Sequence, residues 1–286
     1  MAVAQVNGLS IGYDIIGDGA RPWILTPGGR YARDTPGLRQ LAEAIAQRDA
    51  RVVIWDRPNC GESDVCFEGE SESTLNADTM VALLEHLGMA PAVLAAGSAG
   101  ARVCLLAEAR HPGSAQAIAL WWPSGGAHEL FTLGNVYCVP QTRTAYEFGM
   151  DAVANLPDWA EQIRRNPGNR QRIAGQDFKT FVETMDRWLK AFIPRDDQVI
   201  PGLPNDDLAK IDVPALVFQS GESDANHPRW VSQALADTLP NARLADPPWG
   251  DREWWELRKD HAAGIFRRWP LLAPQLTDWA DEVLRG

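Results

Sequence analysis

The stretch Ala95-Ala96-Gly97-Ser98-Ala99-Gly100 follows the short apolar run 92–94 and decides how the rest of the chain is interpreted. Small residues flank Ser98 at minus two (Ala96) and plus two (Gly100), so the backbone can fold into a sharp turn between a strand and a helix. Such a turn lifts the hydroxyl out of the sheet to a helix N-terminus, where free amides favour negative charge. We therefore expect Ser98 to be a nucleophile. The alternative is a plain tight turn before a helix.

Strand and helix patterns alternate on both sides of this turn. Asn7-Gly8 between two alternating segments, 3–6 and 9–15, predicts a β-hairpin. Further strands are expected over 22–25, 51–55, 92–95, 115–121, 213–219 and 242–245, and helices over 38–46, 77–87, 99–110, 230–239 and 276–284. This order predicts an α/β fold with a mostly parallel, doubly wound sheet that helices cover on both faces.

Residues 124–205 interrupt this alternation with aromatic-rich segments of helical spacing and no convincing strand. We interpret them as a helical cap, or lid, inserted between core strands over the carboxyl edge of the sheet, where open α/β sheets bind ligands. The α/β core would then comprise residues 1–123 and 206–286. The alternative is an ordinary helical layer.

Composition excludes several classes of function. Among 286 residues, 45% are hydrophobic and 23% charged, and the formal net charge is −11. An acidic chain without a basic run is poorly suited to nucleic acid or anionic membranes. No segment approaches the roughly 18 apolar residues of a membrane span, and the N-terminus does not resemble a signal peptide. Four cysteines without metal-ligand spacing predict free thiols in a reducing cytoplasm, and we expect no metal.

A serine nucleophile needs an imidazole base. Among the five histidines, His261 falls after the last strand and before the last helix, so its segment returns to the edge that carries the serine. We expect His261 to be the base, with His227 and His128 as alternatives. His86 and His111 lie at helix ends and are expected to be structural.

The imidazole in turn needs an orienting carboxylate. Asp224 follows the strand 213–219 in the turn Ser220-Gly221-Glu222-Ser223-Asp224 and is the expected acid. Glu222 competes locally but is expected to point outward, and Asp224 could instead only cap the following helix. The chain order of serine, aspartate and histidine is the one stated for α/β-hydrolase triads.

The developing oxyanion needs backbone donors. Ala99, directly after the serine, supplies one amide, and Gly29, in the flexible Gly28-Gly29 pair, is the expected second. Arg30 could reach into the pocket and hold a substrate carboxylate, or it could pair with local acids.

Twelve tryptophans suggest an aromatic-lined pocket. We take Trp122, Trp159 and Trp188 as candidate substrate-binding residues. Cys60 falls in a loop near the predicted site and is expected to pack rather than react.

Four motifs carry a resemblance that extends over nearly the whole chain: Thr26-Pro27-Gly28-Gly29, Asp56-Arg57-Pro58-Asn59-Cys60-Gly61-Glu62-Ser63, Ala96-Gly97-Ser98-Ala99-Gly100 and Gly221-Glu222-Ser223-Asp224. They resemble those of capped α/β-hydrolases, which include esterases, lactonases, carbon–carbon bond hydrolases and proline iminopeptidases. Three positions depart from the family pattern. Pro27 stands where a histidine is usual, Ala96 replaces the first glycine of the elbow, and Asp260 rather than glycine precedes His261.

The resemblance implies a cytoplasmic serine hydrolase that cleaves an ester or lactone of a small, largely apolar molecule through an acyl-enzyme, without a cofactor. The partner is a small-molecule substrate, and a homodimer is one assembly left open. Hydrolysis of a carbon–carbon bond in a β-diketone or vinylogous acid uses the same residues. An aminopeptidase would need an acidic pocket, for which Glu129 and Glu147 are available. A non-catalytic ligand-binding protein with the same fold is the remaining alternative.

Overall fold

A computed structural model describes residues 2–260 and 263–285. Its centre is an eight-stranded sheet in the order β1-β2-β4-β3-β5-β6-β7-β8. The hairpin strands β1 and β2 are antiparallel to their neighbours, and β4 to β8 run parallel with β3. The strands are β1 (Ala2–Val6), β2 (Leu9–Ile16), β3 (Arg21–Thr26), β4 (Ala50–Trp55), β5 (Ala92–Gly97), β6 (Ala115–Trp121), β7 (Ala215–Phe218) and β8 (Ala242–Ala245). The predicted α/β class and mostly parallel sheet are confirmed.

The central strands are buried on both faces, because helices cover the sheet on each side. Along β3, Trp23 and Leu25 point into one apolar cluster and Ile24 into the other. β5 alternates in the same way, with Val93 facing one side and Leu94 the other. This period of two follows from the pleat of an extended chain.

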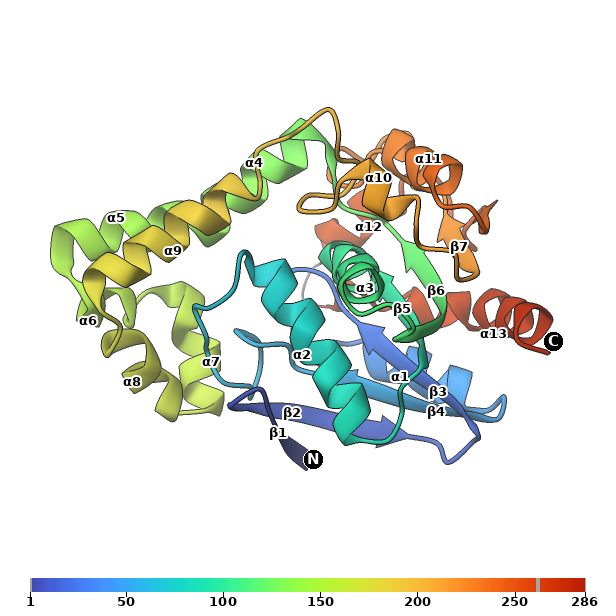
Figure 1. Cartoon of the computed structure of the whole chain (residues 1–286), viewed down its shortest axis with the longest axis horizontal. Helices are drawn as coiled ribbons and strands as arrows, with labels where there is room; N and C mark the ends of the chain where they lie inside the picture. The colour runs from blue at the N-terminus through green and yellow to red at the C-terminus, as the bar shows by residue number, and fades with distance from the viewer. Residues whose placement is uncertain (1, 261–262, 286) are drawn as a thin grey trace.

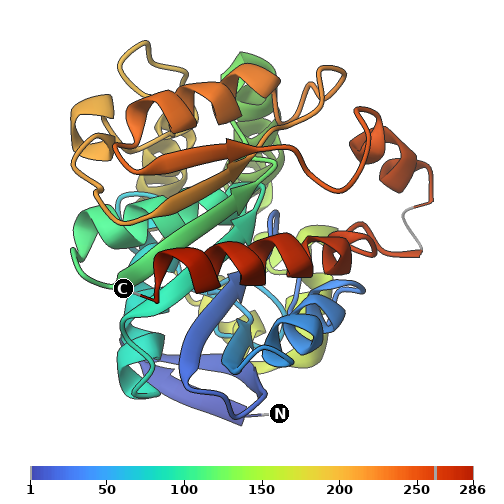
Figure 2. The ribbon, with the colours of Figure 1, turned by 90° about the vertical axis from the view of Figure 1, so that its right-hand side faces the viewer.

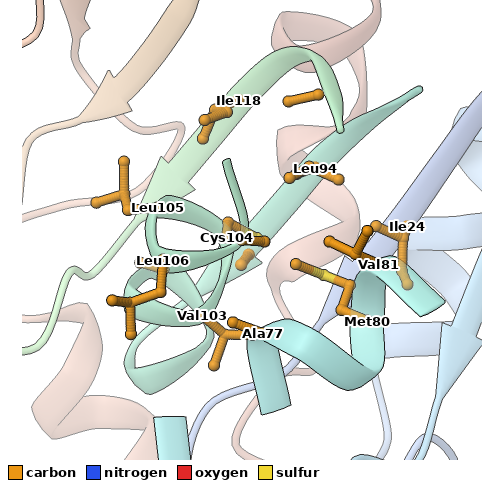
Figure 3. Close-up of a cluster of buried hydrophobic side chains, with 14 of the residues drawn as sticks. Ile24, Ala77, Met80, Val81, Leu94, Val103, Cys104, Leu105, Leu106 and Ile118 are labelled. Atoms are coloured by element: carbon orange, nitrogen blue, oxygen red, sulfur yellow. The ribbon is translucent and has the colours of Figure 1, made fainter. Parts of the chain in front are cut away.

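Two helical layers complete the core. One face of the sheet packs against α2 (Glu72–His86), α3 (Ala99–Arg110) and α11 (Arg229–Thr238), and the other against α1 (Leu38–Ala46) and α13 (Ala273–Val283). Figure 2 shows α13 crossing in front of the strands, opposite the layer that contains α3. Figure 3 shows the cluster that contains Ile24, in which Leu94 and Ile118 of the sheet lie near Met80 and Cys104 of the helices.

Between β6 and β7 the chain forms a set of helices beside the sheet, which we call the inserted helices (Figure 1). They have their own apolar cluster, centred on Trp159, Phe181 and Trp188, which also includes Val65 and Phe67 from the core loop after β4. They are α4 (Gly126–Tyr137), α5 (Val139–Phe148), α6 (Met150–Val153), α7 (Ala160–Arg165), α8 (Gly168–Ala174) and α9 (Phe178–Lys190). The short helix α10 (Asn205–Leu208) follows them and packs on the core, where Leu208 joins the same cluster as Ile24.

The structure differs from the predicted elements mainly at their ends. Helix α2 begins at Glu72, five residues earlier than its apolar spacing indicates. The reason is a local cap, in which the Ser71 hydroxyl accepts a hydrogen bond from the Thr74 amide and the Thr74 hydroxyl accepts one from the Ser71 amide. The segment after β8, for which the sequence predicted no helix, contains α12 (Glu253–Lys259). In residues 2–260 and 263–285, no helix is long and apolar enough to cross a membrane.

Candidate active site

Ser98 lies at the junction of β5 and α3, in a backbone conformation that L-residues rarely adopt. Its φ is 56° and its ψ is −128°. A methyl group on Gly100 would approach the Thr26 carbonyl oxygen to 2.4 Å, and one on Gly28 would approach the Ser98 Cβ to 2.4 Å. Small residues are therefore required both after the serine and in the loop facing it. This strained turn presents a partly exposed hydroxyl at the start of α3.

Asp224 and His227 lie in a single turn after β7, and both are buried. One carboxylate oxygen of Asp224 accepts hydrogen bonds from the backbone amides of Asn226 (2.9 Å) and His227 (3.0 Å). The other lies 2.9 Å from His227 Nδ1. These bonds fix the imidazole so that its Nε2 lies 2.9 Å from Ser98 Oγ. The result is a continuous hydrogen-bonded chain from carboxylate to imidazole to hydroxyl.

From the sequence, His261 is the expected base in this position, with His227 and His128 as the alternatives. His261 lies outside the described residues. The place beside the serine is taken by the imidazole of His227. The physical reason is local: an aspartate three residues before a histidine in a tight turn can both cap that turn and orient the ring, without help from a distant loop. The Asp-x-x-His spacing of Asp224 and His227 was the signal in the sequence that could have pointed to His227.

Two tryptophans enclose the imidazole. The Trp122 ring stacks on that of His227, with centroids 5.9 Å apart and planes 19° apart. The Trp254 ring and the imidazole are arranged edge to face, with their centroids 4.6 Å apart. The Trp254 indole also donates a hydrogen bond to Asn226, within the turn that holds the histidine. Trp122, predicted to bind substrate, therefore contacts the imidazole directly.

The loop after β3 is held against the elbow by Arg57. This buried guanidinium donates hydrogen bonds to the carbonyl oxygens of Gly28 (3.2 Å) and Gly29 (2.6 Å). Gly29 has a φ of 52°, in the left-handed region. Gly29 and Ala99, the two predicted oxyanion donors, both line one small cavity next to the elbow.

Arg30 is engaged with partners of this chain. Its guanidinium forms an ion pair with Glu72, with an Nε to Oε1 distance of 3.0 Å, and lies 4.7 Å from the ring centre of Tyr137 and 4.6 Å from that of Trp159. The structure thus shows the local acid pairing that was the alternative to a substrate carboxylate. Arg30 joins the core to the inserted helices.

The remaining candidates lie away from the serine. Trp159 and Trp188 are buried inside the cluster of the inserted helices, where the Trp159 indole donates to Gln141 and the Trp188 indole to the carbonyl of Gly69. Glu222 is exposed and pairs with Arg229, as its expected outward orientation requires. Among the described residues, no three histidine, cysteine or acidic side chains converge as metal ligands.

The four cysteines are buried and free. Cys60 also lines the cavity beside the elbow, and burial raises the pKa of its thiol to about 11. A thiol with that pKa stays protonated at neutral pH, so it packs as a small apolar group.

A mostly parallel sheet with helices on both faces, and a serine at a strained strand-to-helix turn, define the α/β-hydrolase class. The sequence matches the family model described as the alpha/beta hydrolase family over residues 16–277, and the chain belongs to that family. No curated protein matches it.

Similar solved structures include an N-acyl homoserine lactone degrading enzyme, with 21% identity, coverage of 97% of this chain and 98% of that chain, and a TM-score of 0.58. Another is the enol-lactonase from Burkholderia xenovorans LB400, at 22% identity, with 97% and 99% covered and a TM-score of 0.58. A third is a thermophilic esterase from Thermogutta terrifontis, at 18% identity, with 99% and 97% covered and a TM-score of 0.58. At these identities the likeness establishes a shared fold.

Proposed function

We propose that the protein is a serine hydrolase that cleaves an ester or lactone of a small molecule, with Ser98 as nucleophile, His227 as base and Asp224 as orienting acid. The observation that carries the proposal is the pair of 2.9 Å contacts that join the three side chains in series. This assignment replaces His261 with His227 as the base. Solved structures of a lactone-degrading enzyme, an enol-lactonase and an esterase share the fold, which supports this class of substrate.

The proposed reaction has two halves. Ser98 Oγ attacks the carbonyl carbon while His227 Nε2 takes its proton, and the carbon–oxygen bond to the leaving group then breaks as the imidazolium returns that proton to the departing oxygen. Water attacks the acyl-enzyme with His227 again as base, which releases the carboxylic acid and restores the serine. Asp224 stabilises the imidazolium in both halves. The amides of Ala99 and Gly29 would donate to the oxyanion.

We also propose that residues 124–205 act as a lid over this site. Asn169 of α8 anchors them to the core, because its side-chain amide donates to the Ser63 carbonyl (3.0 Å) and its side-chain oxygen accepts from the Val65 amide (2.8 Å). Tyr137 and Phe192 close the cavity that Gly29 and Ala99 line from the core side. A substrate at the serine would thus lie between the core and these helices.

The test uses a fluorophosphonate probe and a panel of p-nitrophenyl esters, lactones and β-diketones. The wild-type protein should be labelled and should hydrolyse members of the ester or lactone set, and Ser98→Ala should do neither. Ser114→Ala serves as the matched control and should retain both properties. Ser114 lies directly before β6, whereas the Ser98 turn lies beside the other end of that strand, at Trp121. A folded wild-type protein that is neither labelled nor active would support a ligand-binding role instead. Cleavage confined to β-diketones would favour the carbon–carbon bond reaction.

A further inference from the structure

Arg102 is a buried cation with unused hydrogen-bond donors. It lies in the first turn of α3, four residues after Ser98, and only 3% of it is exposed. Its Nε and one terminal guanidinium nitrogen, Nη1, have no hydrogen-bond partner within residues 2–260 and 263–285. The contact that its charge does make is with the Phe192 ring, whose centre is 5.3 Å away. Glu72 and Glu129 attract this charge through space, but among the described residues no ion pair joins either carboxylate to it. A buried charge without a paired counter-ion carries a large desolvation penalty, which one such ring contact does not offset.

The position of Arg102 in its helix adds to this cost. The N-terminal turn of a helix carries partial positive charge, which disfavours a cation there. Burial lowers the pKa of Arg102 to about 10, so the guanidinium still carries its charge at neutral pH. The guanidinium is therefore charged and buried, and its Nε and Nη1 atoms are unpaired among the described residues. It also lies at a helix end whose partial positive charge disfavours a cation. Binding an anion would remove the penalty.

The surroundings of Arg102 have an excess of positive charge. It lines a cavity of about 20 Å³ together with Arg30, Arg57 and Glu72. Glu72 is the one carboxylate among the residues that line it, and it is already occupied by the ion pair with Arg30 and by a hydrogen bond from the Asn59 amide (2.9 Å). Arg57 uses one guanidinium nitrogen on two neutral carbonyl oxygens. The whole chain carries a net charge of −11, so the positive charge of this cavity comes from the particular residues that line it.

The same cavity is lined by Gly29 and Ala99, the proposed oxyanion donors. Ala99 precedes Arg102 by three residues on α3, which is less than one helical turn, or about 4.5 Å along the axis. A group bound to Arg102 would therefore lie in the same cavity as the two proposed oxyanion donors. The volume suits one water molecule or a similarly small polar group, with the rest of the ligand extending toward the serine.

We propose that Arg102 binds a carboxylate on the acyl part of the substrate, so that the preferred substrates are half-esters of short dicarboxylic acids or lactones of their hydroxy derivatives. This inference rests on the proposed hydrolase function. A carboxylate is favoured because a guanidinium presents several donors in a planar array that matches two carboxylate oxygens. The sequence predicted an ester or lactone of a largely apolar molecule. This proposal differs in placing a carboxylate on the acyl part of that molecule.

The first test compares two esters of equal acyl length, monomethyl glutarate and methyl pentanoate, by acid release at constant pH. The wild-type enzyme should favour the charged ester by about tenfold or more in kcat/KM, and in Arg102→Met this ratio should fall to about one. Arg102→Lys should restore part of it. The control Arg110→Met, on the exposed end of the same helix, should keep the wild-type ratio. A wild-type ratio near one, or an unchanged ratio in Arg102→Met, would overturn the inference.

The second test measures binding without turnover. Glutarate should bind Ser98→Ala, as followed by calorimetry and by thermal stabilisation, and the double variant Ser98→Ala/Arg102→Met should lose this binding. If no ester is hydrolysed but glutarate binding depends on Arg102, the proposed function fails and the anion site stands. If esters are hydrolysed but glutarate binding does not depend on Arg102, the function stands and water alone satisfies this guanidinium.

Discussion

At the scale of single residues, Asp224 and His227, the proposed acid and base, share one turn. Asp224 Oδ1 closes the turn by accepting two backbone amides, and Oδ2 meets the imidazole of His227. The geometry of the pair is thus set by four consecutive residues. The rings of Trp122 and Trp254 restrict the remaining rotation of the imidazole. The segment after β8 need not supply a side chain to the serine.

The residue-scale prediction concerns the choice of base. His227→Ala should lower kcat on the active ester by on the order of 10³-fold or more, because the serine loses its proton acceptor. His261→Ala and His128→Ala should each change kcat by less than about tenfold. Steady-state kinetics on the purified variants, with circular dichroism to verify folding, would decide. A large loss in His261→Ala together with a small one in His227→Ala would refute the assignment.

At the scale of elements, the site depends on how closely α3 approaches the end of β3. The Gly100 Cα faces the carbonyl oxygens of Thr26 and Pro27, where an added methyl group would lie 2.4 and 2.9 Å from them. The turn at Ser98 and the loop that carries Gly29 are therefore positioned against each other by a backbone-to-backbone contact.

The element-scale prediction is that Gly100→Ala pushes α3 away from β3. Overpacking of this kind costs about 1–3 kcal/mol of unfolding free energy, and the displaced Ser98 should react more slowly with a fluorophosphonate. The matched control is Gly250→Ala, where an added methyl group meets nothing within 4 Å. Urea denaturation and labelling rates measure the two effects. Equal behaviour of the two variants would show that the contact is not required.

At the scale of the whole molecule, the core holds ionisable groups that stay neutral because they are buried. Cys60 and Cys66 are both buried, and desolvation raises the pKa of each thiol to about 11. In the unfolded chain these thiols would ionise near pH 9. Folding stability is consequently linked to pH on the alkaline side.

The whole-molecule prediction is a loss of stability between about pH 9 and pH 11. In this window the unfolded state has released the thiol proton while the folded state retains it, so the free energy of unfolding falls by up to about 1.4 kcal/mol per pH unit for each thiol. Cys60→Ala should show a shallower decline than the wild type. Urea denaturation at several pH values from 8 to 11 would measure it, and identical slopes would contradict the prediction.

Much of the fold was predictable because its signals are local. Asn7-Gly8 specified the hairpin, and apolar spacing located α1 over its observed residues Leu38–Ala46. The start of α2 was missed because a polar cap at Ser71, rather than apolar spacing, sets it. In the site, Ser98 and Asp224 were expected from strand ends followed by small residues. His227 ranked below His261 because strand order indicates which loops meet but not which ring reaches the serine.

Sequence by itself determined the class of fold, the tight turn at Ser98 and the turn that carries Asp224, since each depends on residue size and spacing within a few positions. Only the tertiary structure decided the partner of Ser98, the occupation of Arg30 by Glu72 and the isolation of Arg102. Each of these depends on which side chains from distant segments come within hydrogen-bond reach in a dry interior. Local pattern carries no information about such distances, whereas the energy of a buried charge depends on them directly.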